Sequence, residues 1–236
     1  MTEPRACAAL LGVLLFTAIG CAAACADETV QIADSAAVLL RPSSPVASVI
    51  LMPGGDGLIN AGPNGQINRL IGNQLVRTRN AYLARGLAVL VANADIDLAR
   101  AVQFMGEIKK PVTVIATSRG TIRTAEGIAR GAKPNALVLT SGFLTVESGG
   151  VPNVASILGA PNALAPTLVI HHRDDGCRFT QPAGVGPFVS WAAGRARAVW
   201  LSGGISVGDP CEARAYHGFN GLHEDVVILA AGFHGQ

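Results

Sequence analysis

The chain has 236 residues, of which 50% are hydrophobic and 14% are charged, and its formal net charge is +2. This composition supplies a large core and excludes a disordered chain. The balanced charge, without a basic run or an aromatic ladder, gives no support for nucleic-acid binding or for electrostatic docking on a membrane. The length suits a single compact domain.

The N-terminal segment has the pattern of a secretory signal. A single Arg5 precedes an apolar run over 8–19, and Ala24-Cys-Ala26 places small residues where a signal peptidase cleaves. The apolar run is too short to span a bilayer comfortably. We therefore expect a signal peptide over 1–26 and a mature domain over 27–236. This domain would be periplasmic or extracellular and would have no transmembrane span.

Export determines how the cysteines are interpreted. Cys7, Cys21 and Cys25 belong to the expected signal, and Cys21 and Cys25 each follow a small residue. A lipid anchor at Cys21 or Cys25 is therefore an alternative to simple cleavage. Cys177 and Cys211 remain as the mature pair, and in an oxidising compartment they most simply form one disulfide.

The mature chain alternates apolar strands with helices. Strands are expected over 29–32, 36–40, 47–52, 87–94, 112–116, 136–140, 166–171 and 198–201, and helices over 66–85, 98–108, 121–130, 187–196 and 224–233. This order predicts an α/β fold with a mostly parallel sheet flanked by helices on both faces. Such sheets bind ligands at the carboxyl ends of their strands. The irregular segment 142–166 is too short for a lid domain, and we expect it to form a wall of the pocket.

Ser118 stands between an apolar β-branched strand and a helix, with small residues around it. A serine on such a sharp turn is held in a strained, exposed position where its oxygen can attack a carbonyl carbon. The helix that follows directs unpaired N–H groups and the positive end of its dipole at the same place. This pattern indicates a serine hydrolase.

A serine nucleophile needs a base, and the base needs an acid that orients it. The segment His171-His-Arg-Asp-Asp-Gly-Cys177 follows one late strand and offers Asp174 or Asp175. His217 and His223 both follow the last strand. The chain order is therefore serine, aspartate and histidine, each after a different strand.

The polar residues near the strand ends also have to be compared with a metal site and with a phosphate-binding loop. His171 and His172 are adjacent on a strand and should point to opposite faces, which argues against a metal site. The turn Pro53-Gly-Gly-Asp-Gly57 is neither a dinucleotide fingerprint nor a P-loop. Asp95, which also follows a strand, is expected to be structural.

These motifs resemble those of the α/β-hydrolase superfamily, specifically its small, lidless, esterase-like members. The resemblance rests on the elbow Ala116-Thr-Ser-Arg-Gly120, the turn Pro53 to Gly57, the segment His171 to Asp175, and His217-Gly-Phe219. Ala116 replaces the first glycine of the usual Gly-x-Ser-x-Gly elbow. The resemblance implies an α/β-hydrolase fold without a large lid, and no metal or organic cofactor.

The resemblance also selects among the candidate residues. The family acid commonly closes a His-Gly-x-x-Asp pattern, which maps onto Asp175 rather than Asp174, although His172 replaces the glycine. The family base precedes Gly-Phe and the terminal helix, as His217 does. His223 lies at the start of that helix and is the weaker match.

The oxyanion that forms on attack needs two aimed N–H donors. One should be the amide of Arg119, directly after the nucleophile. Pro53 and Gly54 stand where the family has a His-Gly pair, which indicates Gly55 as the second donor and Asp56 as the alternative.

These residues together predict a secreted serine hydrolase that cleaves small carboxylic esters or thioesters through an acyl-enzyme. Ser118 would attack the carbonyl, His217 would relay the proton and Asp175 would hold the imidazole. The same residues would also serve an acyltransferase or an amidase, and a non-catalytic ligand-binding module on the same fold is the rival class. A bridge from Cys177 to Cys211 would tie the acid segment to the base segment.

Overall fold

The computed structural model describes residues 27–234. Its element order is β1 (Glu28–Ile32), β2 (Ser35–Leu40), β3 (Ala47–Met52), α1 (Gln74–Leu83), β4 (Leu87–Val91), α2 (Leu98–Ile108), β5 (Val112–Thr117), α3 (Gly120–Ala129), β6 (Ala136–Thr140), α4 (Val146–Gly149), α5 (Val154–Leu158), β7 (Thr167–His172), α6 (Val185–Trp191), β8 (Ala196–Leu201) and α7 (His223–Ala231). Short 3-10 turns lie at Pro63–Gly65, Pro161–Ala163, Pro182–Gly184 and, as η4, at Tyr216–Gly218. The expected signal peptide and both candidate lipid sites lie outside the described residues.

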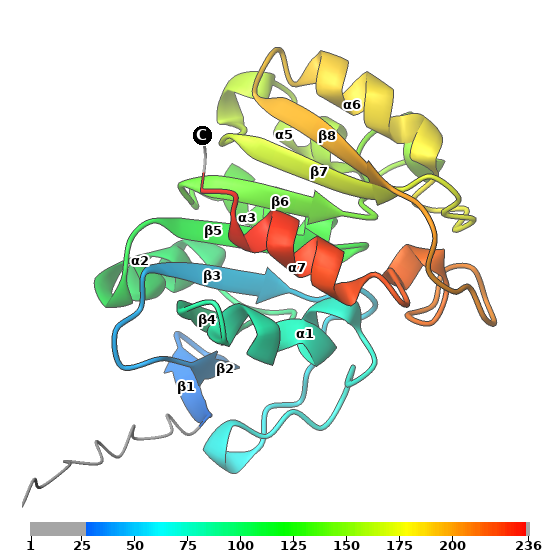
Figure 1. The fold of residues 1–236 in the computed structure, drawn as a ribbon. Helices are drawn as coiled ribbons and strands as arrows, with labels where there is room; N and C mark the ends of the chain where they lie inside the picture. Colours follow the sequence, from blue (N-terminus) through cyan, green and yellow to red (C-terminus); the bar gives the residue numbers. More distant parts are fainter. Residues whose placement is uncertain (1–26, 235–236) are drawn as a thin grey trace, which may run out of the picture.

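One sheet organises the molecule, with the strand order β1-β2-β4-β3-β5-β6-β7-β8. The pairs β1–β2 and β2–β4 are antiparallel, and every other neighbouring pair is parallel. Figure 1 shows this twisted sheet with α1 and α7 crossing the near face and α2 and α3 behind it. The predicted mostly parallel sheet is therefore confirmed.

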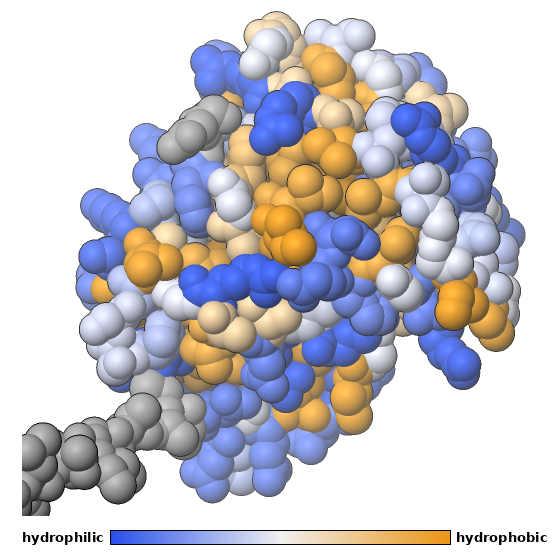
Figure 2. Space-filling model, viewed as in Figure 1, coloured by the Kyte–Doolittle hydropathy of each residue, from blue (hydrophilic) through white to orange (hydrophobic). Residues whose placement is uncertain are grey.

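The apolar strands divide their side chains between two cores. In β3, Ile50 and Met52 belong to the core that α2, α3 and α6 cover, whereas Val49 and Leu51 belong to the core under α1 and α7. This alternation follows from the two-residue period of a strand. Figure 2 shows apolar residues gathered over the middle of the near face, where α7 lies.

Several element boundaries differ from the sequence-based expectation, most of all the start of α1 and the end of α6. Helix α1 begins at Gln74 rather than at 66, because Asn73 caps the helix by accepting the N–H of Leu75 at 3.1 Å. Helix α6 ends at Trp191, because Ala193 and Gly194 adopt positive φ, and the chain enters β8 at Ala196 rather than at 198.

The segment 142–166 is more regular than its composition indicates. It contains the short helices α4 and α5, each with a capping box at its N-terminus, formed by Thr145 with Ser148 and by Asn153 with Ser156. No helix among residues 27–234 combines the length and apolar character needed to cross a membrane. Asp95 accepts hydrogen bonds from Ser35 and Asn93, a local role like the one expected.

Candidate active site

Ser118 occupies a tight turn between β5 and α3. Its φ is +51°, in the left-handed region that non-glycine residues rarely adopt, and its N–H donates to the carbonyl of Thr140 at 3.0 Å. A Cβ at Gly120 would overlap the carbonyl oxygen of Met52, and a Cβ at Gly54 would lie 2.9 Å from that of Ser118. The two glycines therefore let the turn approach the end of β3, which leaves the serine half-exposed.

The two candidate aspartates have different surroundings. Asp175 is buried, its Oδ1 accepts the N–H of Cys177 at 2.9 Å, and its Oδ2 lies 3.1 Å from Nδ1 of His217. The side chain of Asp174 is 68% exposed. The structure thus brings Asp175, and not Asp174, to the histidine.

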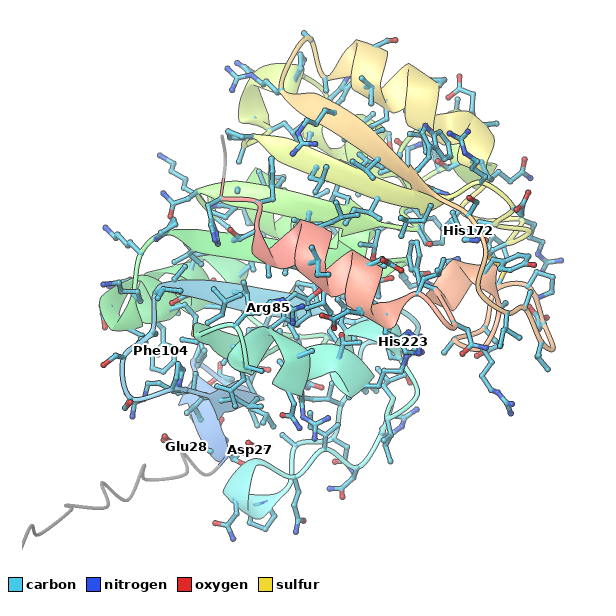
Figure 3. All side chains as sticks on the ribbon, in the orientation of Figure 1. Asp27, Glu28, Arg85, Phe104, His172 and His223 are labelled. Carbon is cyan, nitrogen blue, oxygen red and sulfur yellow. A yellow bond between two sulfur atoms is a disulfide. The ribbon has the colours of Figure 1, made fainter. Side chains whose placement is uncertain are left out.

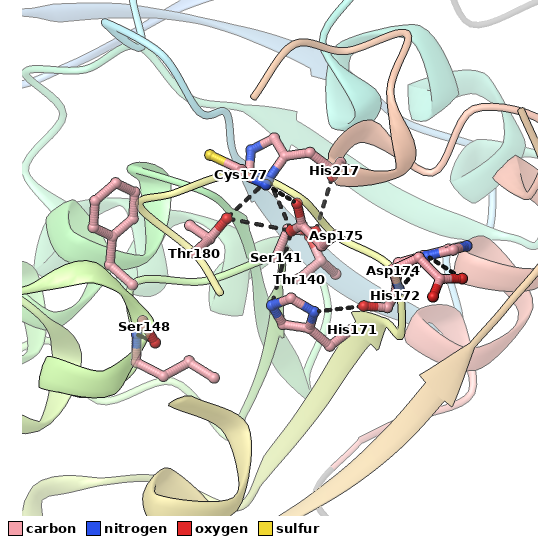
Figure 4. A network of polar contacts seen from close by, with 12 residues as sticks. Thr140, Ser141, Ser148, His171, His172, Asp174, Asp175, Cys177, Thr180 and His217 are labelled. Carbon is pink, nitrogen blue, oxygen red and sulfur yellow. Dashed lines mark hydrogen bonds and ion pairs between the residues drawn. The ribbon is translucent and has the colours of Figure 1, made fainter. Parts of the chain in front are cut away.

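Thr180 joins this pair, and sequence reasoning missed it. Its buried hydroxyl lies 3.0 Å from Nδ1 of His217 and 3.3 Å from Oδ2 of Asp175 (Figure 4). A carboxylate oxygen only accepts, so the hydroxyl donates to Asp175. The threonine therefore supports one oxygen of the carboxylate and the Cys177 amide supports the other. No sequence signal identifies it, because threonines near strand ends are common.

His217 lies in η4, and its side chain is almost fully buried. Its backbone carbonyl accepts the hydroxyl of Ser141 at 2.8 Å. With Nδ1 donating to Asp175, the imidazole is held in the tautomer that leaves Nε2 free to accept a proton.

Arg77 fixes the backbone on either side of His217. Its guanidinium donates to the carbonyls of Gly218 and Ala213, the latter at 3.1 Å, and faces Nδ1 of His223 at 3.1 Å. Burial, and next the charge of Arg77, lowers the pKa of His223. Figure 3 places His223 at the start of α7. His223 is thus engaged with α1 rather than with Asp175.

Ser118 and His217 line one cavity of about 250 Å³. Its walls come from the turn after β3, the N-terminus of α1, the end of β5 and the segment before α7. The lining residues are Gly54, Gly55, Leu70, Gly72, Asn73, Gln74, Thr117, Ser118, Cys211, Glu212, Ala213, His217 and Gly218. All of these segments lie at the carboxyl ends of the strands, where a parallel sheet binds its ligands.

The two expected oxyanion donors, Gly55 and Arg119, belong to two different turns near Ser118. Gly55 lines this cavity with φ of +60°, and Arg119 directly follows Ser118 at the start of α3. Within residues 27–234, neither backbone N–H donates to another protein group. The alternative, Asp56, turns its carboxylate to the N–H of Leu58 and to Arg69.

His171 and His172 point to different surroundings, as adjacent strand residues should. The ring of His171 is buried, with Nε2 3.9 Å from Oδ2 of Asp175, and burial lowers its pKa although Asp175 opposes this. The ring of His172 stacks on Tyr216 with centroids 4.3 Å apart, and its Nε2 lies 2.9 Å from the carbonyl of Gly203.

The predicted disulfide between Cys177 and Cys211 is confirmed. It joins two loops that are separated by 34 residues in sequence. One follows Asp175, and the other precedes His217 and lines the cavity. The bridge therefore links the loop that carries Asp175 to the loop that carries His217.

A second hollow of about 480 Å³ lies on the other side of the start of α3. It is lined by Arg119, Ile122, Arg123, Glu126, Phe143, Gly149, Gly150, Val151, Pro152 and Phe179. Phe143 and Phe179 stack there with ring centroids 6.3 Å apart. The expectation for 142–166 is corrected accordingly: residues 143 and 149–152 of the segment line this hollow, and none of its residues lines the cavity that contains Ser118.

No protein-family model matches the sequence, and no curated protein matches it either. Solved structures do match the fold. An α/β serine hydrolase homologue from Coxiella burnetii has a TM-score of 0.59 at 17% identity, covering 87% of this chain and 95% of that one. The esterase domain of a Rhodothermus marinus protein gives 0.56 at 14%, covering 87% and 96%.

A dienelactone hydrolase from Anabaena variabilis gives a TM-score of 0.54 at 13% identity, covering 87% of this chain and 94% of that one. At such low identity, a shared fold is what the likeness establishes. The strand order, the helices on both faces and the turn at Ser118 agree with it. The chain has the α/β-hydrolase fold.

Proposed function

We propose that this protein is a serine hydrolase that cleaves carboxylic esters or thioesters, with Ser118 as nucleophile, His217 as general base and Asp175 as the group that orients the base. One observation carries the proposal. The buried carboxylate of Asp175 lies 3.1 Å from Nδ1 of His217, in a histidine that lines the same cavity as Ser118. The proposal thus takes its acid, base and nucleophile from segments that follow three different strands, with the half-exposed Ser118 on the same cavity as His217.

The chemistry follows from these positions. His217 takes the hydroxyl proton of Ser118 on Nε2, and the serine oxygen forms a bond to the ester carbonyl carbon. The oxyanion is held by the free amides of Gly55 and Arg119. Collapse breaks the bond to the alcohol oxygen, which leaves with the proton from His217. Water then gives a proton to His217 and attacks the carbonyl carbon of the acyl-enzyme. The bond to Oγ of Ser118 breaks, Oγ takes the proton back from His217, and the acid is released.

Asp175 keeps the imidazole oriented and stabilises the charge that it carries between the two proton transfers. The carboxylate has three supports for this role: the Cys177 amide, the Thr180 hydroxyl and the His217 ring. A cavity of about 250 Å³ suits a small acyl or alcohol group. The names of the structural neighbours, esterase and serine hydrolase homologue, agree with this activity.

We also propose export. The signal pattern over 1–26 and the disulfide both support it, since disulfides persist in oxidising compartments. Mass spectrometry of the mature N-terminus tests it. A chain that begins at Asp27 indicates a periplasmic or extracellular protein, a lipid-modified Cys21 or Cys25 indicates a membrane anchor, and an intact Met1 contradicts export.

A fluorophosphonate probe tests the catalytic proposal. The folded protein should form a covalent adduct on Ser118 and hydrolyse a short-chain p-nitrophenyl ester, and Ser118→Ala should lose both. Ser43→Ala, at an exposed serine in another loop, is the matched control and should keep both. If the folded, disulfide-bonded protein neither forms the adduct nor hydrolyses the ester, the proposal is wrong and a binding module becomes the better interpretation.

A further inference from the structure

Arg123 lies one turn into α3, behind the turn formed by residues 53–57, which we call the oxyanion turn. Its guanidinium donates to three successive carbonyls of that turn: Nη2 to Pro53, Nη2 to Gly54 at 3.5 Å, and Nη1 to Gly55 at 3.2 Å. Burial, and next the charge of Arg119, lowers the pKa of Arg123. The group nevertheless stays protonated, because a guanidinium does not titrate in the usual pH range.

These contacts set the direction of the amides. A trans peptide is planar, so its C=O and N–H point in opposite directions. A carbonyl held toward Arg123 therefore turns the N–H of the next residue away from it. Gly54 and Gly55 line the cavity with Ser118, whereas Arg123 does not. The guanidinium thus binds the turn from behind and leaves the Gly55 N–H to the cavity side.

The Gly54 carbonyl also accepts the N–H of Gly57 at 3.1 Å, the backbone bond that closes the turn, so Arg123 adds a second restraint to the same peptide. Two consecutive glycines have the widest choice of backbone conformation, and Gly55 sits at a positive φ of +60°. Rotation of the Gly54–Gly55 peptide would exchange its N–H for its C=O, and a carbonyl oxygen repels the oxyanion that the N–H stabilises.

The oxyanion turn also packs closely against the guanidinium of Arg123. A Cβ at Gly57 would lie 2.6 Å from Cζ of Arg123, so the turn closes over the charged group. The nearest carboxylate of the turn, on Asp56, pairs instead with Arg69 at 2.6 Å. Among residues 27–234, Arg123 forms no ion pair, so its bonds go to the backbone carbonyls.

We propose that Arg123 is a positioning residue, which holds the Gly54–Gly55 peptide with its N–H facing the oxyanion. This inference rests on the proposed function, because Arg123 would act on the same hydrolysis reaction through the Gly55 N–H. It predicts a role in stabilising the transition state, since the peptide acts on a charge that is absent from the ground-state ester.

The test compares Arg123→Met and Arg123→Lys with Arg79→Met. Arg79 is also half-buried, but its guanidinium bonds only a carbonyl of its own helix, that of Val76 at 2.8 Å. Active sites are counted by end-point titration with the fluorophosphonate, so that misfolded protein does not enter the rates. The readouts are kcat, KM and the affinity for a phenylboronic acid, which forms a tetrahedral adduct with the serine.

For Arg123→Met we expect kcat to fall by about 100-fold, as when one oxyanion donor is lost, and boronate affinity to fall with it while KM changes little. Arg123→Lys should be intermediate, because an ammonium can bond one carbonyl but lacks the planar fork. Arg79→Met should leave both unchanged. If Arg123→Met does not fold, Arg123→Lys decides by the same readouts.

Several outcomes would overturn the inference. They are an unchanged kcat with unchanged boronate affinity, and a loss that appears only in KM or only in thermal stability. A wild-type protein that neither reacts with the probe nor hydrolyses the ester contradicts the proposed function itself, which is a different result.

Discussion

Two regions meet at the cavity and are built in different ways. The first contains the proposed nucleophile, and we call it the nucleophile side: Ser118 and the oxyanion turn lie directly at the ends of β5 and β3, which are neighbours in the sheet. The second contains the proposed acid and base, and we call it the acid–base side: Asp175 lies in the acid loop, residues 173–181, and His217 in the longer base loop, residues 202–222. Residues 202–210 of the base loop are exposed.

The supports of the two sides differ accordingly. On the nucleophile side, the turn after β3 packs directly against the turn at Ser118. Gly54 and Gly120 permit this contact, because neither position has room for a Cβ. The acid–base side is joined by cross-links between distant segments: the disulfide, the hydroxyl of Thr180 and the guanidinium of Arg77. A short turn at a strand end is ordered by the sheet, whereas a long loop needs added links to offset its conformational entropy. We therefore expect the nucleophile side to be sensitive to added side-chain atoms. We expect the acid–base side to be sensitive to the loss of a cross-link.

The largest expected effect separates the two aspartates of the acid loop. Asp175→Asn should lower kcat/KM by about 10⁴-fold, because the amide no longer selects the productive tautomer of His217. Asp174→Asn, at the exposed neighbour, should stay within about 2-fold of wild type, since exposed charges contribute little. Ester hydrolysis by the two purified variants checks this, and similar losses in both would contradict the assignment of Asp175.

The next largest effect concerns the cross-link. Replacing both Cys177 and Cys211 by alanine should lower the free energy of unfolding by up to about 4 kcal/mol, the chain-entropy value for a loop of this length. Urea unfolding measures it. Limited proteolysis should cut the base loop first, because its exposed part has lost its anchor. Unchanged unfolding together with an unchanged cleavage pattern would show that the disulfide does not support this side.

The nucleophile side should respond to a single methyl group. Gly54→Ala places a Cβ 2.9 Å from Cβ of Ser118, so either the serine or the turn must move. We expect a stability loss of about 1–3 kcal/mol from overpacking and a fall in kcat of about 10- to 100-fold from the displaced nucleophile. The control is Gly186→Ala, where a Cβ meets no atom within 4 Å. Equal kcat values in the two variants would contradict the view that close packing at Gly54 positions Ser118.

The smallest effect is a pH dependence of stability on the acid–base side. Burial lowers the pKa of His171 in the folded protein, so the unfolded chain binds its proton first as the pH falls. The stability that neutral His171 contributes is complete above its ordinary pKa of about 6.5 and is lost as the pH falls from there toward the lower folded pKa. The slope for one proton is at most about 1.4 kcal/mol per pH unit.

Urea unfolding at pH 7 and pH 5 measures this slope for wild type and for His171→Asn. The wild-type protein should lose more stability than the variant between the two pH values. His223, whose pKa burial also lowers, remains in both proteins and contributes less because solvent screens it. Parallel slopes in the two proteins would assign the pH dependence to other groups.

Local sequence patterns determined most of the fold and part of the site. Apolar β-branched runs predicted the strands: β2 to β7 are almost entirely buried, which leaves them little choice of composition, whereas the edge strands β1 and β8 are only partly buried. Small residues around Ser118 predicted its turn, since only small side chains fit where helix and strand meet. Together with the order of acid and base, these features depend on residues that are near one another in sequence.

Contacts between distant residues decided the rest. Thr180, Arg77 and Arg123 carry no local signal, because their roles exist only once loops from different strands lie together. The start of α1 was predicted too early, because residues 66–73 are compatible with a helix. The helix begins only at Gln74, since Asn73 caps it by accepting the N–H of Leu75, and this cap outweighs the weak helix propensity of the residues before it. The wall role expected of 142–166 was wrong because tertiary packing placed that segment on the second hollow. Sequence thus determined which backbone elements form, and only the tertiary structure decided which side chains reach across between them.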